Sequence, residues 1–153
     1  MFSSTCRTVA CLLALASCSS ATDPVTPLRI ADLHNTTWHA SLPIWIADTT
    51  TPGVRFACST TWSLAFDGTL FNSPDTLYAM TPGSAYVQCP GQDSMPWYWR
   101  GMGVFVYQIG DTIVLRRVTN IMDFARLGTT GAGTLRGPVD PAFAPRGPLV
   151  LTR

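Results

Sequence analysis

The chain has 153 residues, of which 46% are hydrophobic, 10% aromatic and only 12% charged, and this length suits one domain. All ten basic residues are Arg and all nine acidic residues are Asp, so Lys and Glu, which favour exposed helix surfaces, are missing. In their place stand 20 Thr, 12 Gly and 12 Pro, which favour strands and turns. This composition argues against a helical bundle or a coiled coil. The formal net charge of +1 gives no preference for nucleic acid as a partner.

Residues 1–17 have the pattern of a secretory signal peptide. Arg7 and the amino terminus are positive, and an apolar run over residues 9–16 leads into small residues. The run is too short to cross about 30 Å of hydrocarbon, which needs roughly 20 apolar residues. It is therefore interpreted as the hydrophobic region of a cleaved signal peptide and not as a membrane span.

The end of the apolar run carries the most specific motif in the chain, Leu15-Ala16-Ser17-Cys18. It resembles the lipobox of bacterial lipoproteins, with a branched apolar residue and two small residues before the cysteine. The resemblance implies that Cys18 becomes the mature amino terminus and carries acyl chains such as palmitate, which bind the protein to the membrane of the cell envelope. Because Ser19 and not Asp follows, it also implies the periplasmic face of the outer membrane in a cell with two membranes. The alternative is an ordinary signal peptide with a chance cysteine.

Residues 18–32 are interpreted as the lipidated cysteine followed by a flexible tether. Small polar residues with Pro24 and Pro27 cannot bury enough apolar area to fold. We therefore expect one folded domain over residues 33–153, beginning near Leu33.

Two cysteines, Cys58 and Cys89, remain in this domain. The export pattern places them in an oxidising compartment, where such a pair is read first as a disulfide. A metal site or a reactive thiol is the competing interpretation. The chain has no Cys-x-x-Cys motif, and no histidine lies near either cysteine, so the disulfide is preferred.

Residues 54–66 alternate regularly between a mostly apolar parity and a parity of small or polar residues, which predicts a strand with one buried face. Asp67-Gly68 predicts a hairpin turn into a return strand over 69–71.

Residues 97–109 and 112–118 predict a second hairpin around Gly110-Asp111. One face pairs Ile109 with Thr112, Tyr107 with Val114 and Phe105 with Arg116. The other face, with Val106 opposite Leu115 and Gln108 opposite Ile113, is expected to point inward, and Arg116 is expected to lie over Phe105 or Tyr107.

Shorter strands are expected at 78–80, 84–89, 134–136 and 149–152, with a strand or a single helical turn at 121–127. Residues 128–133 are expected to form a flexible turn, and the proline-rich stretch 137–148 a loop. The fold class is therefore all-β, an antiparallel meander of eight to ten short strands that closes into a small barrel or a sandwich with one disulfide.

The opening of the domain, Asn35-Thr36-Thr37-Trp38, resembles the start of lipocalin-like and calycin-like barrels, and equally that of META-type β domains. In lipocalin-like barrels an early Trp closes the barrel floor against a late Arg. The resemblance implies that role for Trp38, with Arg126 or Arg136 as its cover.

The densest aromatic cluster lies at residues 95–100. On a strand, Trp97 and Trp99 share one face, and Tyr98 and Arg100 share the other. Either the tryptophans fill the core, or these four residues line a barrel mouth and bind a ligand or a partner.

Catalytic and metal-binding patterns are weak. His34 and His39 fall on opposite faces of a strand and cannot act as a local metal pair. No Gly-x-Ser-x-Gly nucleophile motif is present, and Asp67 and Asp111 are explained as turn residues. We therefore predict neither an enzyme nor a metal or other cofactor.

The sequence is thus interpreted as a membrane-anchored envelope lipoprotein whose β domain binds a small apolar ligand or an envelope protein. The alternatives are a structural or assembly lipoprotein without a ligand and an envelope hydrolase. A hollow interior would favour an apolar ligand, and a filled interior would favour an interaction or structural role.

The lipobox interpretation predicts that Cys18→Ser blocks cleavage at this site, because the variant lacks the thiol that accepts the lipid. Intact mass of the protein from the membrane fraction checks this. A wild-type chain with an unmodified Cys18 at its amino terminus would contradict the prediction.

Overall fold

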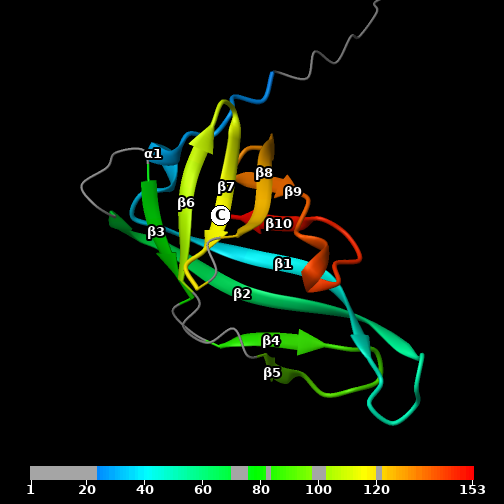
Figure 1. Cartoon of the computed structure of the whole chain (residues 1–153). Helices are drawn as coiled ribbons and strands as arrows, with labels where there is room; N and C mark the ends of the chain where they lie inside the picture. The colour runs from blue at the N-terminus through cyan, green and yellow to red at the C-terminus, as the bar shows by residue number, and fades with distance from the viewer. Residues whose placement is uncertain (1–23, 70–75, 82–83, 98–102, 120–121) are drawn as a thin grey trace, which may run out of the picture.

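The computed structural model describes residues 24–69, 76–81, 84–97, 103–119 and 122–153. Within these ranges the chain forms ten strands and two short helical turns (Figure 1). In chain order they are α1 (Ile30–Leu33), β1 (Thr36–Ala47), β2 (Arg55–Thr69), β3 (Thr76–Met80), β4 (Ala85–Gln88), β5 (Met95–Trp97), β6 (Gly103–Ile109), β7 (Thr112–Arg117), β8 (Asp123–Gly131), β9 (Thr134–Gly137), η1 (Pro141–Phe143) and β10 (Leu149–Thr152).

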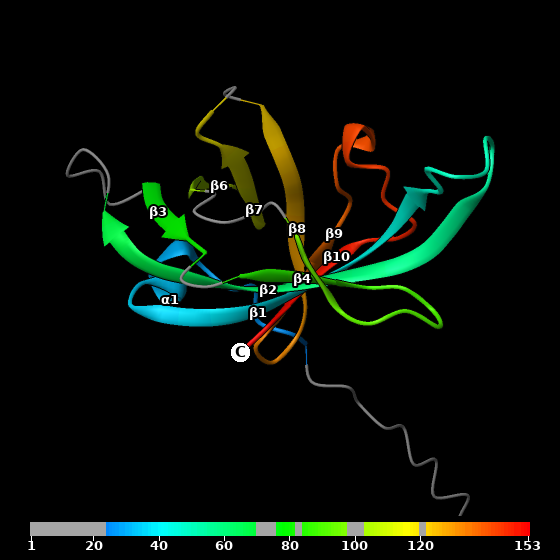
Figure 2. The same ribbon diagram turned by 90° about the horizontal axis from the view of Figure 1, so that it is seen from below.

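Eight of the strands form a closed antiparallel barrel. Their order around it is β1-β10-β9-β8-β7-β6-β3-β2, and pairing of β2 with β1 closes the ring. β4 and β5 extend the sheet from β2 outside this ring, and Figure 2 shows the long, curved β1 and β2 on one side with β6, β7 and β8 facing them. The predicted all-β antiparallel fold is confirmed, and it is a barrel.

Strand β2 has three partners. One edge pairs with β1 over residues 55–66, whereas the other pairs with β4 at 59–61 and with β3 at 65–69. The predicted hairpin turn at Asp67-Gly68 is wrong, because β2 continues to Thr69 and the irregularity appears as a register shift against β3. At Gly68 a Cβ atom would lie 3.3 Å from Tyr78 Cβ, so glycine permits the close approach of the two strands there.

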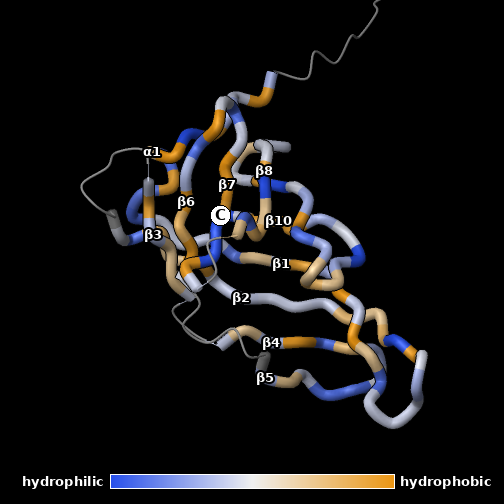
Figure 3. The backbone as a smooth tube through the Cα atoms, in the orientation of Figure 1, coloured by the Kyte–Doolittle hydropathy of each residue, from blue (hydrophilic) through white to orange (hydrophobic). Residues whose placement is uncertain are grey.

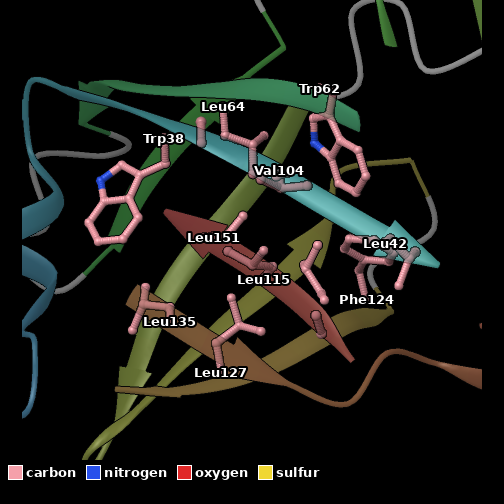
Figure 4. Close-up of a cluster of buried hydrophobic side chains, with 14 of the residues drawn as sticks. Trp38, Leu42, Trp62, Leu64, Val104, Leu115, Phe124, Leu127, Leu135 and Leu151 are labelled. Atoms are coloured by element: carbon pink, nitrogen blue, oxygen red, sulfur yellow. The ribbon is translucent and has the colours of Figure 1, made fainter. Parts of the chain in front are cut away.

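The inward-facing side chains form a single buried cluster within the barrel (Figure 4). Apolar residues from all eight barrel strands contribute to it, as expected for a barrel of this strand number, whose interior side chains can fill. Its largest members are Trp38, Trp62, Leu64, Phe66 and Phe124, each no more than 4% exposed. The buried apolar area in this cluster is the main source of the fold's stability.

The short helix α1 lies at one end of the barrel, close to Trp38 (Figure 4). Leu33 of α1 is fully buried, Trp38 Nε1 donates a hydrogen bond to Thr36 Oγ1 at 2.8 Å, and the Thr36 hydroxyl donates to the Leu33 carbonyl. Trp38 is therefore buried at this end of the barrel, beside α1. The arginine cover is wrong, because the side chains of Arg126 and Arg136 are exposed and α1 occupies this place instead.

The packed part of the chain begins before Leu33. The Leu28 backbone N–H donates to Thr129 Oγ1 at 2.7 Å, and that of Ile30 donates to Gln108 Oε1 at 3.0 Å. Ile30 is buried and Leu28 packs against the core. The last residues of the predicted tether are therefore packed against the barrel.

The hairpin of β6 and β7 matches the predicted register. Ile109 pairs with Thr112, Tyr107 with Val114 and Phe105 with Arg116, as expected. Val106, Ile113 and Leu115 on the opposite face are buried, so the predicted choice of the inward face is also confirmed.

For residues 121–127 the sequence allows either a strand or a single helical turn. The structure has a strand there, β8, which begins at Asp123. It continues through Gly128 to Gly131, so the turn expected over 128–133 is shorter than predicted. Pairing with β9 continues β8 past Gly128, and the register between the two strands shifts between Thr129 and Gly131.

The predicted disulfide is confirmed. Cys58 on β2 and Cys89, just after β4, are bonded, and their Cα atoms lie 4.3 Å apart. Both residues are buried on the inward face of the sheet, where the bond ties the β4–β5 extension to β2.

Removing this bond should lower the free energy of unfolding by about 3–4 kcal/mol, because it closes a loop of 31 residues in the unfolded chain. Urea unfolding of the wild type and of a Cys58→Ala/Cys89→Ala variant measures the difference. Equal midpoints for the two proteins would contradict the prediction.

Candidate functional site

The first cluster of polar side chains lies on the outside of β6, β7 and β8. Asp123 accepts hydrogen bonds from Tyr107 Oη at 2.7 Å, Arg116 Nε at 2.8 Å and Arg126 Nη2 at 2.9 Å. Arg116 Nη2 also donates to Tyr107 Oη at 2.6 Å. The Arg116 guanidinium lies over the Tyr107 ring, 4.8 Å from its centroid, so the expected stacking is confirmed on Tyr107.

This cluster is internally satisfied. Burial alone would raise the pKa of Asp123, but hydrogen bonds from Tyr107, Arg116 and Arg126 outweigh that effect and hold its pKa below the ordinary value. Burial and the bond to Asp123 raise the pKa of Tyr107. Since the carboxylate already accepts three donors, the cluster is suited to holding three strands together and not to proton transfer.

A different arrangement lies on the outer face of β1, β2 and β4. From Ala57 to Ser63 the outward side chains of β2 are small, and larger ones flank them on β1 and β4, so a groove runs along this part of β2. We call this surface the outer groove and define its floor as Ala57, Ser59, Thr61 and Ser63.

Two adjoining hollows, of about 330 and 340 Å³, make up the outer groove. Their walls come from β1, from β4 and from the loop before β10. The wall side chains are His39, Ser41, Pro43, Tyr86, Gln88 and Arg146. From Ser59 to Thr61 the backbone of β2 is paired on both edges, so polar contacts from this part of the floor to a bound molecule must come from side chains.

Aromatic rings border the outer groove on both sides. Tyr86 on β4 is 48% exposed, and Trp45 on β1 is 41% exposed. The Arg146 guanidinium lies over the Trp45 ring at 4.8 Å from its centroid, while the Arg146 backbone N–H donates to the Pro43 carbonyl at 2.8 Å. The loop before β10 is thereby fixed against β1, and it presents a stacked Trp–Arg pair beside the groove.

His39 and Ser63 face each other across β1 and β2, with 3.4 Å between Nδ1 and Oγ. Both lie on the exposed face, and in the described part of the chain the side-chain hydrogen bond of His39 is to Ser63 and not to a carboxylate. His34 lies instead at the C-terminal end of α1. No group of three or more His, Cys, Asp or Glu side chains that could hold a metal ion is found within the described ranges.

Several residues predicted from the sequence lie outside the described residues. These are Cys18, Tyr98, Trp99 and Arg100, and the side chain of Trp97 is outside them as well. The Trp97 backbone ends β5, where it pairs with Ala85.

Sequence reasoning missed the outer groove. Its trace in the sequence is the row of small or polar residues on the outward parity of 55–65, a pattern that by itself predicts an outward strand face and no groove. Tyr86 lies beside this row because β4 pairs with β2. This pairing cannot be predicted from the sequence.

No protein-family model, curated protein or solved structure shows a significant match to this chain. In the described ranges, no helix has the length and apolar character that crossing a membrane requires.

The Asp123 cluster predicts an acid-sensitive contribution to stability. Because the pKa of Asp123 is lowered by folding, its contribution is present above the ordinary carboxyl pKa and is lost as the pH falls through the folded-state value. Asp123→Asn should cost about 1–3 kcal/mol at pH 7, with a shrinking difference from the wild type below about pH 4. Urea unfolding across this pH range measures both, and Asp93→Asn on the exposed β4–β5 loop is the control. A difference that stays constant with pH would contradict the prediction.

Proposed function

We propose that this protein is a membrane-anchored lipoprotein of the bacterial cell envelope, which binds a partner protein at the outer groove. The anchor rests on the motif ending at Cys18. The binding role rests on one observation, that exposed aromatic and arginine side chains border a groove on the outside of a barrel whose inward-facing residues form a buried core.

The buried core favours external binding over an apolar ligand inside the barrel. Trp38 and Phe66 lie toward the α1 end, and Trp62, Phe124 and Phe143 are linked by ring contacts elsewhere in the core. Side chains of this size occupy the space that a lipid-like ligand would need.

The residue types around the outer groove favour a protein partner. Trp, Tyr and Arg dominate the binding energy of protein interfaces, and here Trp45, Tyr86 and Arg146 surround a floor of small residues. Small floor residues let a partner's side chains approach the sheet closely. The hydroxyls of Thr61 and Ser63 supply hydrogen bonds once water is displaced.

The proposal predicts that the groove is covered in the envelope and open in the purified protein. Thr61→Cys places a thiol on the exposed floor, and its maleimide labelling should be several-fold slower in isolated envelopes than in purified protein. Mass spectrometry of the labelled chain measures both rates.

Met122→Cys is the matched control, because Met122 is 52% exposed and precedes β8, on the barrel wall opposite β1 and β2. This thiol should react at the same rate in both preparations. Equal rates for Thr61→Cys in the two preparations would overturn the binding role, and slowing at both positions would show general shielding by the envelope instead of a partner in the groove.

A further inference from the structure

The segment before α1 is fixed to one end of the barrel, which we call the proximal end and define by residues 25–33 and the β6–β7 turn. Besides the bonds of Leu28 and Ile30, Arg29 Nη1 donates to the Gly110 carbonyl at 3.3 Å and lies 3.1 Å from Asp111 Oδ1. Figure 1 shows the described chain leaving the barrel from this end, away from β4 and β5. The path of the chain toward Cys18 therefore starts at a fixed place on the barrel.

Two exposed apolar side chains lie at the proximal end. Ile109, at the end of β6, is 55% exposed, the highest fraction among the large apolar residues of the described ranges, and Val25 is 48% exposed. Figure 3 shows hydrophobic colouring both on the segment before α1 and on the β6–β7 hairpin. Arg29 pairs with Asp111, so within residues 25–33 and the β6–β7 turn the exposed Asp32 leaves a formal net charge of −1.

The length of chain between Cys18 and the described residues limits how far the proximal end can be from a lipid at Cys18. Five residues, 19–23, separate Cys18 from Pro24. A fully extended chain spans at most about 3.3–3.6 Å per residue, so the distance from Cys18 to Pro24 cannot exceed roughly 20 Å.

We propose that the proximal end is a lipid-facing surface, on which Ile109 and Val25 contact the interfacial region of the bilayer. This inference rests on the lipid anchor in the proposed function. The short connection to Cys18 holds this surface close to the bilayer. A protein partner at the same surface would have to enter the narrow gap between barrel and membrane, so we infer that the bilayer itself contacts it. The β1–β2 turn and the β4–β5 extension then lie at the membrane-distal end.

The test places a nitroxide spin label at Ile109→Cys or at Val54→Cys in the protein purified from the membrane fraction. Val54 is the matched position, since it is also a β-branched aliphatic residue, is 41% exposed, and precedes β2 at the other end of the sheet. Each protein is reconstituted in vesicles of phosphatidylethanolamine and phosphatidylglycerol. Collision with oxygen, which concentrates in lipid, and with a water-soluble nickel complex is measured by electron paramagnetic resonance.

The Ile109 label should be several-fold less accessible to the nickel complex than the Val54 label, and more accessible to oxygen. Equal water exposure of the two labels would overturn the inference, and so would equal protection, because the barrel would then lie on its side. The intact mass of the same sample reports acylation at Cys18. An acylated protein with a water-exposed Ile109 label refutes the lipid-facing surface and leaves the anchor standing, whereas an unacylated Cys18 refutes the anchor itself.

Discussion

The pairing of β2 with three neighbours is the constraint on which the rest of the structure depends. Its alternating pattern fixes which side chains enter the barrel, and a shift of one residue would reverse every one of them. Its edge toward β1 closes the ring, whereas its other edge is shared between β3 within the ring and β4 outside it. One strand therefore supplies both a wall of the core and the floor of the outer groove.

Three arginine side chains pack against aromatic rings of this fold. Arg116, Arg117 and Arg146 each lie over an aromatic ring, at 4.8, 5.1 and 4.8 Å from the ring centroid. A planar guanidinium can stack on a ring and still donate hydrogen bonds at its rim, which a lysine ammonium cannot do in the same way. In a chain that has no lysine, these stacked pairs let basic residues cover apolar surface at the ends of strands.

The parts of the fold that the sequence predicted depend on short-range pattern. The β6–β7 hairpin follows from alternation on both sides of Gly110-Asp111, and even the position of Arg116 over Tyr107 could be anticipated. The same reasoning failed at Asp67-Gly68, where pairing with β3 overrides the local preference for a turn.

Features that require knowledge of distant neighbours were not predictable. Helix α1 has only four residues, too few for a helical period to appear in the sequence. Burial of Leu33 at the end of the barrel stabilises it. The outer groove needs the pairing of β4 with β2, and three residues predicted to bind, Tyr98, Trp99 and Arg100, lie outside the described residues. Binding surfaces built from several strands are a property of topology and not of any one segment.

The pairing of β1 with β10 also sets the order in which the molecule can be completed. Only three residue pairs, His39 with Thr152, Ala40 with Leu151 and Ser41 with Val150, join the first strand to the last. They connect positions more than a hundred residues apart, so the entropy of closing this loop must be overcome late in folding. Until the final residues are synthesised, β1 and β9 each keep an unpaired edge that can pair with another chain. During folding, β1 must therefore avoid pairing with other chains until β10 takes its place beside it.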